Sequence, residues 1–335
     1  MPKDLNRNTM DHQVRTLHRL DRLIWGIVAT VAIIVFAAPL LNDFRIAWRT
    51  FATPTLACAL LLAAGSFYRR WRPDARLASG LLSTAQVVAF GAVAAPLSYI
   101  AASANLPLYD HGLDAIDRAI GFDWKALLAI MDASPLTHAA LLPAYLSLML
   151  QTTTVVLCLA FSGRLLWLRV YIIAFFCAAL ISIAISVVLP AVGAWPYYAL
   201  SEDNSRILPA VSTSWPVFYG LRDGTFRFLV AVGAEGIITF PSLHAALAVI
   251  MIAAIWPVAV LRWVFVALNT MMLIATPIDG SHYLIDVLAG IALALFCLIA
   301  ARAIAARAGA GGDRPTAETP SRLRTSTPSS WGTPG

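Results

Sequence analysis

The chain has 335 residues, of which 59% are hydrophobic and only 13% charged, and this balance excludes an ordinary soluble globular protein. The composition instead predicts an all-α fold, a polytopic helix bundle in a membrane. The formal net charge of +6 does not indicate a nucleic-acid partner, because the basic residues stand beside apolar runs rather than along one polar face.

Eight apolar runs approach the length of about 20 residues that a helix needs to cross a bilayer. They follow a basic segment, residues 1–22, and form a membrane domain over residues 23–303. Residues 304–335 are rich in Gly, Pro, Ser, Thr and Arg and are expected to form a disordered tail. The runs cover residues 23–41, 53–68, 78–103, 136–161, 166–189, 240–259, 261–278 and 282–302.

The distribution of basic residues predicts the orientation of these runs. Arg69, Arg70 and Arg72 cluster after the second run, and most of the other basic residues fall in segments on that same side. Because Lys and Arg accumulate on the cytoplasmic side, both termini are expected to be cytoplasmic. The protein is then expected in the cell membrane of a bacterium, the inner membrane where there are two.

Two segments assigned to the outer side are longer than simple connections. Residues 108–132 carry aspartates together with apolar residues at near-helical spacing, which predicts an amphipathic outer helix. Such a helix either guides a lipid headgroup or forms a solvated cap, and the sequence leaves both open. Residues 190–239 form an outer loop with several aromatic residues and arginines, and long ordered loops usually carry function.

Two short stretches at the outer ends of apolar runs carry the candidate catalytic residues. His282 and Asp286 are four residues apart, so on a helix they lie on one face, where a carboxylate can orient an imidazole. His244 is expected to be the complementary acid. It follows Pro241, which suits a first helical turn, and Ser242, which stands where a helix start attracts anions.

These residues resemble the signature of the type 2 phosphatidic acid phosphatase superfamily, membrane lipid phosphatases related to vanadium haloperoxidases. The family pairs a Pro-Ser-Gly-His block with a later His-x-x-x-Asp block, and Leu243 stands here where Gly is commoner. The resemblance extends roughly from residue 106 to residue 290. Four stretches look like the inositol phosphorylceramide synthase-like branch and its bacterial relatives: residues 121–124, 145–151, 190–193 and 239–246.

The resemblance implies a phosphoryl-transfer enzyme that acts on a lipid phosphate and needs no metal or other cofactor. In it, His282 is the nucleophile that forms a phosphohistidine, Asp286 orients its imidazole, and His244 protonates the leaving oxygen. If water attacks the phosphohistidine, the protein is a lipid phosphate phosphatase. If a hydroxyl compound such as inositol attacks, it is a headgroup transferase. The lipid, the acceptor and the oligomeric state are left open.

Two phosphate-binding features of the family pattern are absent. No Lys-x6-Arg-Pro block precedes Pro241, and Ala275-Thr276 replaces the Ser-Arg pair expected before His282. Other groups must then bind the phosphate. The expected ligands are Ser242 and Gly280 at the two stretches, and Arg222, followed by Arg227 and then Arg206, from the outer loop.

Two alternatives remain for the same residues. Two histidines and one aspartate can form a facial metal triad, although a metal gives no reason for Ser242 at a helix start or for the nearby arginines. Histidine and aspartate can also relay protons in a transporter. In this chain they stand near the ends of the apolar runs, and the centres of the runs hold no charged residue.

Overall fold

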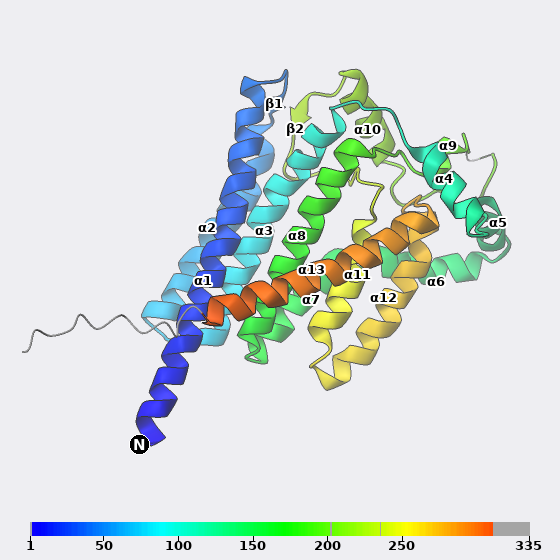
Figure 1. Cartoon of the computed structure of the whole chain (residues 1–335). Coiled ribbons are helices and arrows are strands. Elements are labelled where there is room, and N and C mark those ends of the chain that lie inside the picture. Colours follow the sequence, from blue (N-terminus) through cyan, green and yellow to red (C-terminus); the bar gives the residue numbers. More distant parts are fainter. Residues whose placement is uncertain (1, 202, 235, 311–335) are drawn as a thin grey trace, which may run out of the picture.

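The computed structural model describes residues 2–201, 203–234 and 236–310, with side chains from residue 12 onward. Residues 311–335, most of the expected tail, lie outside this description. Most of the described chain is helical and it has only two short strands, which confirms the all-α class (Figure 1). The helices are α1 (Pro2–Ala37), η1 (Ala38–Leu40), α2 (Trp48–Arg70), α3 (Ala75–Ala102), α4 (Asp110–Ala119), α5 (Trp124–Ala133), α6 (Pro135–Leu146), α7 (Leu148–Phe161), α8 (Leu165–Val188), α9 (Ala194–Tyr197), α10 (Ser214–Asp223), α11 (Leu243–Ile255), α12 (Ala259–Asp279) and α13 (Leu284–Ala310).

Six described helices are long and apolar enough to cross a membrane, and the pair α5 and α6, bent by 111°, could add a seventh. These are the helices of an integral membrane protein, but they are fewer than the eight expected. The run at 136–161 divides into α6 and α7, because the amide and hydroxyl of Ser147 both donate to the carbonyl of Ala144 and turn the chain. The run at 240–259 contains only the 13 residues of α11, which begins after Ser242 and ends before Pro257.

The helix α8 lies in the middle of the bundle (Figure 1). It contacts α1, α3, α7, α11 and α13, and most of its length is buried. A helix that is apolar all round belongs in such a position. One charged pair interrupts this core, where Arg169 of α8 binds Asp21 of α1.

The segment expected as one amphipathic helix over residues 108–132 forms two helices, α4 and α5. Gly121 has a φ of +83°, which favours glycine, and the carboxylate of Asp123 accepts two amide hydrogen bonds at the start of α5. The helix α4 turns its acidic face inward, whereas the sequence left open a headgroup-guiding helix and a solvated cap. Its three aspartates are buried, whereas Ile116 is 39% exposed. The buried aspartates of α4 are Asp110, Asp114 and Asp117.

The outer loop expected over residues 190–239 is partly structured. It contains α9, α10 and the strand β2 (Phe228–Leu229). This strand pairs in parallel with β1 (Arg45–Ile46), so the loop is attached to the connection between α1 and α2. Figure 1 shows α10 and both strands at one end of the bundle, and α4, α5 and α9 beside the start of α13.

Candidate active site

The predicted pair of His282 and Asp286 forms at the start of α13. The Nδ1 of His282 lies 3.1 Å from Oδ2 of Asp286, and the same oxygen accepts the amide of Tyr283 at 2.9 Å. When Asp286 is ionised its carboxylate can only accept, and Nδ1 of His282 then carries the proton while Nε2 carries the free lone pair. Burial lowers the pKa of His282 to about 4, which keeps this imidazole neutral at neutral pH.

Ser242 connects the two predicted stretches. Its hydroxyl lies 3.3 Å from Nε2 of His282 and accepts the amide of Ala245, so it also caps α11. Its own amide donates to the carbonyl of Asp286 at 3.1 Å. Gly290 lies at the same crossing, where an added Cβ would stand 2.4 Å from the Ser242 carbonyl. Backbone contact therefore joins the starts of α11 and α13.

His244 lies on the first turn of α11 and stacks on Tyr145 of α6. The ring centroids are 4.3 Å apart and the planes differ by 12°. The hydroxyl of Tyr145 is buried and has no hydrogen-bond partner within the described part of the chain. An added Cβ at Gly280 would stand 3.0 Å from that hydroxyl, so Tyr145 also lies against the segment that leads to His282.

One cavity of about 320 Å³ joins these groups. His244, His282, Gly280, Tyr145 and Thr239 contribute its polar wall. The remaining wall is largely apolar and comes mainly from α3, α7, α8, α10 and the loop before α11. Among the apolar residues are Phe90, Leu148, Phe175, Ile183, Trp215 and Phe218.

Buried carboxylates of α4 hold the start of α13. Asp117 accepts the amides of Leu284 and Ile285 at 2.7 and 2.9 Å, as a capping residue of α13 supplied by another helix. Burial raises the pKa of Asp117, and the two amide hydrogen bonds act in the opposite direction. Asp110 accepts the hydroxyl of Tyr283 at 3.1 Å. The acidic face of α4 thus supports the residues that flank His282.

The segment before α9 forms a second support. Asp110 accepts the amides of Val192 and Gly193. The carbonyl of Ser281 accepts the amide of Ala194 at 2.8 Å, and the Ser281 hydroxyl accepts the amide of Trp195. Ser281, immediately before His282, is therefore fixed by both its backbone and its side chain.

None of the three arginines expected to bind phosphate, Arg222, Arg227 and Arg206, lines the cavity. Arg222 donates to the carbonyl of Leu106 at 2.7 Å and lies over the ring of Phe218, whose side chain forms part of the cavity wall. Arg227 donates to the carbonyl of Leu221 at 2.6 Å. The sequence placed both arginines near Pro241 along the chain, but their side chains serve the packing of α10.

Three features of the site were not identified from the sequence. Tyr145 stands 99 residues before His244 along the chain, so its stacking depends on tertiary structure. The α4 carboxylates were interpreted as a solvated or headgroup-facing surface. The third feature is His138, whose Nε2 lies 3.0 Å from Oδ1 of the buried Asp279. The only sequence signal for Asp110 and Asp117 is a spacing of seven residues, which places them on one helix face.

The comparison with protein families identifies the class of protein to which this site belongs. A family model described as PAP2 superfamily matches residues 111–300, more than half of the chain. The chain belongs to the PAP2 superfamily, a family of phosphatase-type enzymes. The matched range includes α4 from its second residue onward, both predicted stretches and the whole cavity-lining part of α8. Comparisons with curated proteins and with solved structures gave no match.

Proposed function

We propose that the chain catalyses phosphoryl transfer from a lipid phosphate through a phosphohistidine on His282. The observation that carries the proposal is the arrangement of His282, oriented by Asp286 at 3.1 Å, in the same cavity as His244. A nucleophile held by a third group beside a separate acid is the arrangement that covalent catalysis needs. Membership of the PAP2 superfamily supports the phosphatase class.

In the first step, the lone pair on Nε2 of His282 attacks phosphorus, and the bond from phosphorus to the lipid oxygen breaks. Burial lowers the pKa of His244 to about 3, so this imidazole is neutral in the free enzyme and takes up its proton when the negatively charged phosphate binds beside it. It gives that proton to the leaving oxygen, and the lipid alcohol leaves. In the second step a water molecule attacks phosphorus, the nitrogen–phosphorus bond breaks, and His244 takes the proton of the water. Asp286 stabilises the charge on the His282 imidazole throughout.

The cavity wall supports a substrate with an apolar body. Aromatic and aliphatic side chains from α3, α7 and α8 line the cavity that also holds the histidines, including Phe90, Leu148 and Phe175. Burial of apolar surface there stabilises a bound lipid chain by about 25 cal/mol for each Å² removed from water. The polar groups then select the phosphate end of the molecule.

We propose the hydroxyls of Tyr145 and Thr239 and the amides at the start of α11 as phosphate ligands. Tyr145 and Thr239 line the cavity, and Ser242 places the start of α11 beside Nε2 of His282. Gly280 contributes space, because an added Cβ would stand 2.4 Å from the His282 ring. Arg222 is a second candidate, because its guanidinium lies over the ring of Phe218, a residue of the cavity wall. It ranks lower because it would first have to release the Leu106 carbonyl.

The test is to trap the intermediate. Purified protein is incubated with lipid phosphates labelled at phosphorus, quenched, and digested to find the labelled residue. The expected result is an acid-labile label on His282 that is absent from His282→Ala and released as free phosphate in the wild type. A label at another residue, or turnover by His282→Ala, would overturn the proposal.

The acceptor is tested in the same reaction. Added inositol and other hydroxyl compounds are followed for labelled product beside free phosphate. Hydrolysis alone assigns a lipid phosphate phosphatase, whereas transfer to the hydroxyl compound assigns a headgroup transferase. A chelator is included in a parallel reaction. Activity that is lost with the chelator and restored by a divalent ion would instead support the metal triad.

A further inference from the structure

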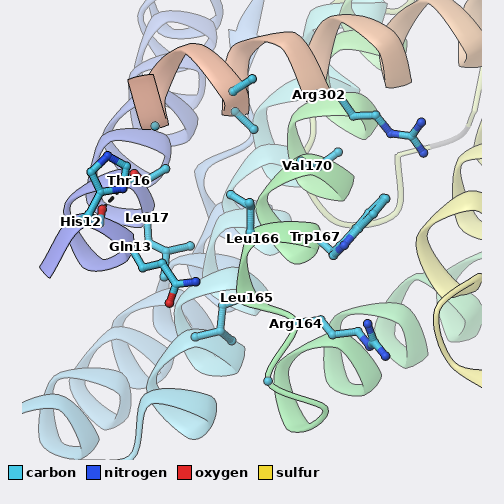
Figure 2. A pocket seen from close by; sticks show the side chains of 14 residues that line it. His12, Gln13, Thr16, Leu17, Arg164, Leu165, Leu166, Trp167, Val170 and Arg302 are labelled. Carbon is cyan, nitrogen blue, oxygen red and sulfur yellow. Dashed lines mark hydrogen bonds between the residues drawn. The ribbon is translucent and has the colours of Figure 1, made fainter. Parts of the chain in front are cut away.

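The beginning of α8, at the other end of this helix from the catalytic cavity, carries two further cavities. The first, of about 590 Å³, lies between α1, α8 and α13 (Figure 2). Its arginines already have partners. Arg164 donates to the carbonyl of Pro257 at 3.1 Å, and Arg302 lies 5.2 Å from the ring centroid of Trp167. In Figure 2 both guanidinium groups point away from His12 and Thr16 on the opposite wall.

The second cavity, of about 610 Å³, lies on another face of α1 and shares Leu17 and Leu165 with the first. It is enclosed by α1, α2, α3 and α8. Each helix contributes residues three or four positions apart, which is the spacing of one helix face. The polar residues that line it are His18, Asp21, Arg22, Ser66, Arg69, Ser79 and Arg169.

Arg169 provides the strongest sign of an absent ligand. Its side chain is 2% exposed, and its Nε and Nη2 donate to the two carboxylate oxygens of Asp21 at 3.0 and 3.1 Å. The third nitrogen, Nη1, is buried without a hydrogen-bond partner among the described residues. A buried donor left unsatisfied destabilises the folded protein, the more so when the group is charged, and a bound acceptor would remove that destabilisation.

The charge of the cavity points to an anion. Asp21 is the single acidic residue among the described residues that line it, and its carboxylate is occupied by Arg169. Arg22 and Arg69 therefore leave an excess of positive charge at the rim. The hydroxyls of Ser66 and Ser79 add two further potential donors.

We propose that this cavity binds the phosphate headgroup of an anionic phospholipid. Arg22 and Arg69 attract the phosphate and Nη1 of Arg169 donates to it, while the lipid chain follows the apolar side chains of the cavity. The lipid is favoured over a soluble anion because α1, α2, α3 and α8 are all candidate membrane spans. Basic pockets between such helices are known to suit anionic lipid headgroups. The apolar residues of the lining include Trp25, Leu62 and Leu82.

The full-length protein is tested by native mass spectrometry in detergent with phosphatidylglycerol or phosphatidylcholine. We expect the wild type to retain phosphatidylglycerol in preference. Arg22→Ala and Arg69→Ala are expected to weaken that binding about fivefold each, as for about 1 kcal/mol per arginine near a membrane surface. Both arginines are exposed, so these changes leave the buried Asp21 and Arg169 pair in place. Arg70→Ala is the matched control, because Arg70 is exposed on α2 beside Arg69 but does not line the cavity.

The His282→Ala protein distinguishes binding at the proposed lipid cavity from binding in the catalytic cavity. It should retain the lipid as the wild type does. Loss of the lipid in that protein would assign it to the catalytic cavity and overturn the proposal. The proposal would also be overturned if phosphatidylglycerol and phosphatidylcholine bound equally well. It would be overturned too if Arg70→Ala weakened phosphatidylglycerol binding as much as Arg22→Ala and Arg69→Ala do. Displacement of the lipid by millimolar inorganic phosphate would show that the site takes a soluble anion.

Discussion

Tyr145 places a polar group in the catalytic cavity that the folded chain does not use. Its hydroxyl is buried and has no partner in the described part of the protein, whereas most buried polar atoms are hydrogen-bonded. The ring itself is fully engaged by stacking on His244. The two contributions of this residue, packing and hydrogen bonding, can therefore be separated by experiment.

Tyr145→Phe should leave the thermal unfolding temperature unchanged or slightly raised, because the stacked ring is retained and an unsatisfied hydroxyl is removed. The rate constant for phosphate release should fall by about 100-fold, the effect of removing one donor to a developing anion. Tyr145→Leu is the comparison variant and should lose stability as well, since it removes the stacking. Wild-type turnover by Tyr145→Phe would remove the hydroxyl from the list of phosphate ligands.

The buried imidazole of His282 should make the protein less stable in acid. Burial lowers the pKa of His282 to about 4 from an ordinary value near 6.5 in the unfolded chain. Between these two values the unfolded chain binds the additional proton, so stability is lost as the pH falls through this window. Across this window the His282 imidazole lowers the free energy of unfolding by at most about 3 kcal/mol.

His282→Gln should reduce this dependence. Thermal unfolding of both proteins in detergent is compared at pH 7 and at pH 4.5. The wild type should lose more stability than the variant on acidification, and His18→Gln, a change near the other end of the bundle, should behave as the wild type. Equal losses in wild type and His282→Gln would show that this imidazole is not held neutral.

At the residue scale, local spacing determined what the sequence could predict. His282 and Asp286 are four residues apart, and the structure joins them at 3.1 Å, although His282 precedes Leu284, the first residue of α13. The stacking of Tyr145 on His244 has no such local signal, because it depends on how α6 packs beside α11. Arg222 failed to reach the cavity for the same reason, since closeness along the chain does not determine where a side chain points.

At the scale of elements, α4 holds the start of α13 in place through hydrogen bonds. The amides of Leu284 and Ile285 belong to the first turn of α13, where no intrahelical acceptor exists. Asp117 supplies that acceptor from another helix. The position of His282, two residues before Leu284, then depends on a carboxylate more than 160 residues away in the sequence.

Asp117→Ala should lower the free energy of unfolding by about 2 kcal/mol, since two amides lose their acceptor. It should also reduce turnover, because the start of α13 is no longer held. Asp74→Ala is the matched control: Asp74 likewise accepts two amides, those of Arg76 and Leu77, at the start of α3. Unfolding in detergent and phosphate release are measured for both. An equal loss of turnover in Asp74→Ala would reduce the effect to general destabilisation.

Gly193 provides a second test of the support around His282. It has a φ of +104°, and an added Cβ would stand 2.5 Å from the Ser281 carbonyl. Gly193→Ala should therefore abolish turnover or prevent folding. Gly233→Ala is the comparison, because Gly233 also has a positive φ, +77°, but no atom lies within 4 Å of an added Cβ. It should cost about 1 kcal/mol of stability and leave turnover intact. Similar behaviour of the two variants would show that the contact with Ser281 is unimportant.

The elements themselves were predicted where apolar length was sufficient, as for α8, α12 and α13. The prediction failed in detail where a polar residue interrupts an apolar run, as Ser147 does between α6 and α7. Composition cannot show this, because the turn is made by hydrogen bonds to one carbonyl. The burial of the acidic face of α4 was also beyond the sequence, since its partners are backbone amides of α13 and of the segment before α9.

At the scale of the whole molecule, the charge distribution predicts that the catalytic end faces outward. Val232 is 53% exposed near β2, and Trp71 is 78% exposed at the other end of α2. In a background without Cys58, Cys158, Cys177 and Cys297, Val232→Cys should react with an impermeant thiol reagent in intact cells. Trp71→Cys should react only after the membrane is permeabilised. The reverse pattern would invert the orientation and place the catalytic cavity on the cytoplasmic side.

The contact between α11 and α13 separates catalysis from substrate selection. The backbone bond from Ser242 to Asp286, with Gly290 at the crossing, fixes the catalytic stretches relative to each other. The apolar wall comes largely from other helices, among them α3 and α8. Substitutions on those helices can reshape the cavity without moving His282 and His244, the proposed nucleophile and acid. Descendants of one ancestral sequence could therefore acquire new substrates gradually while the chemistry stayed intact.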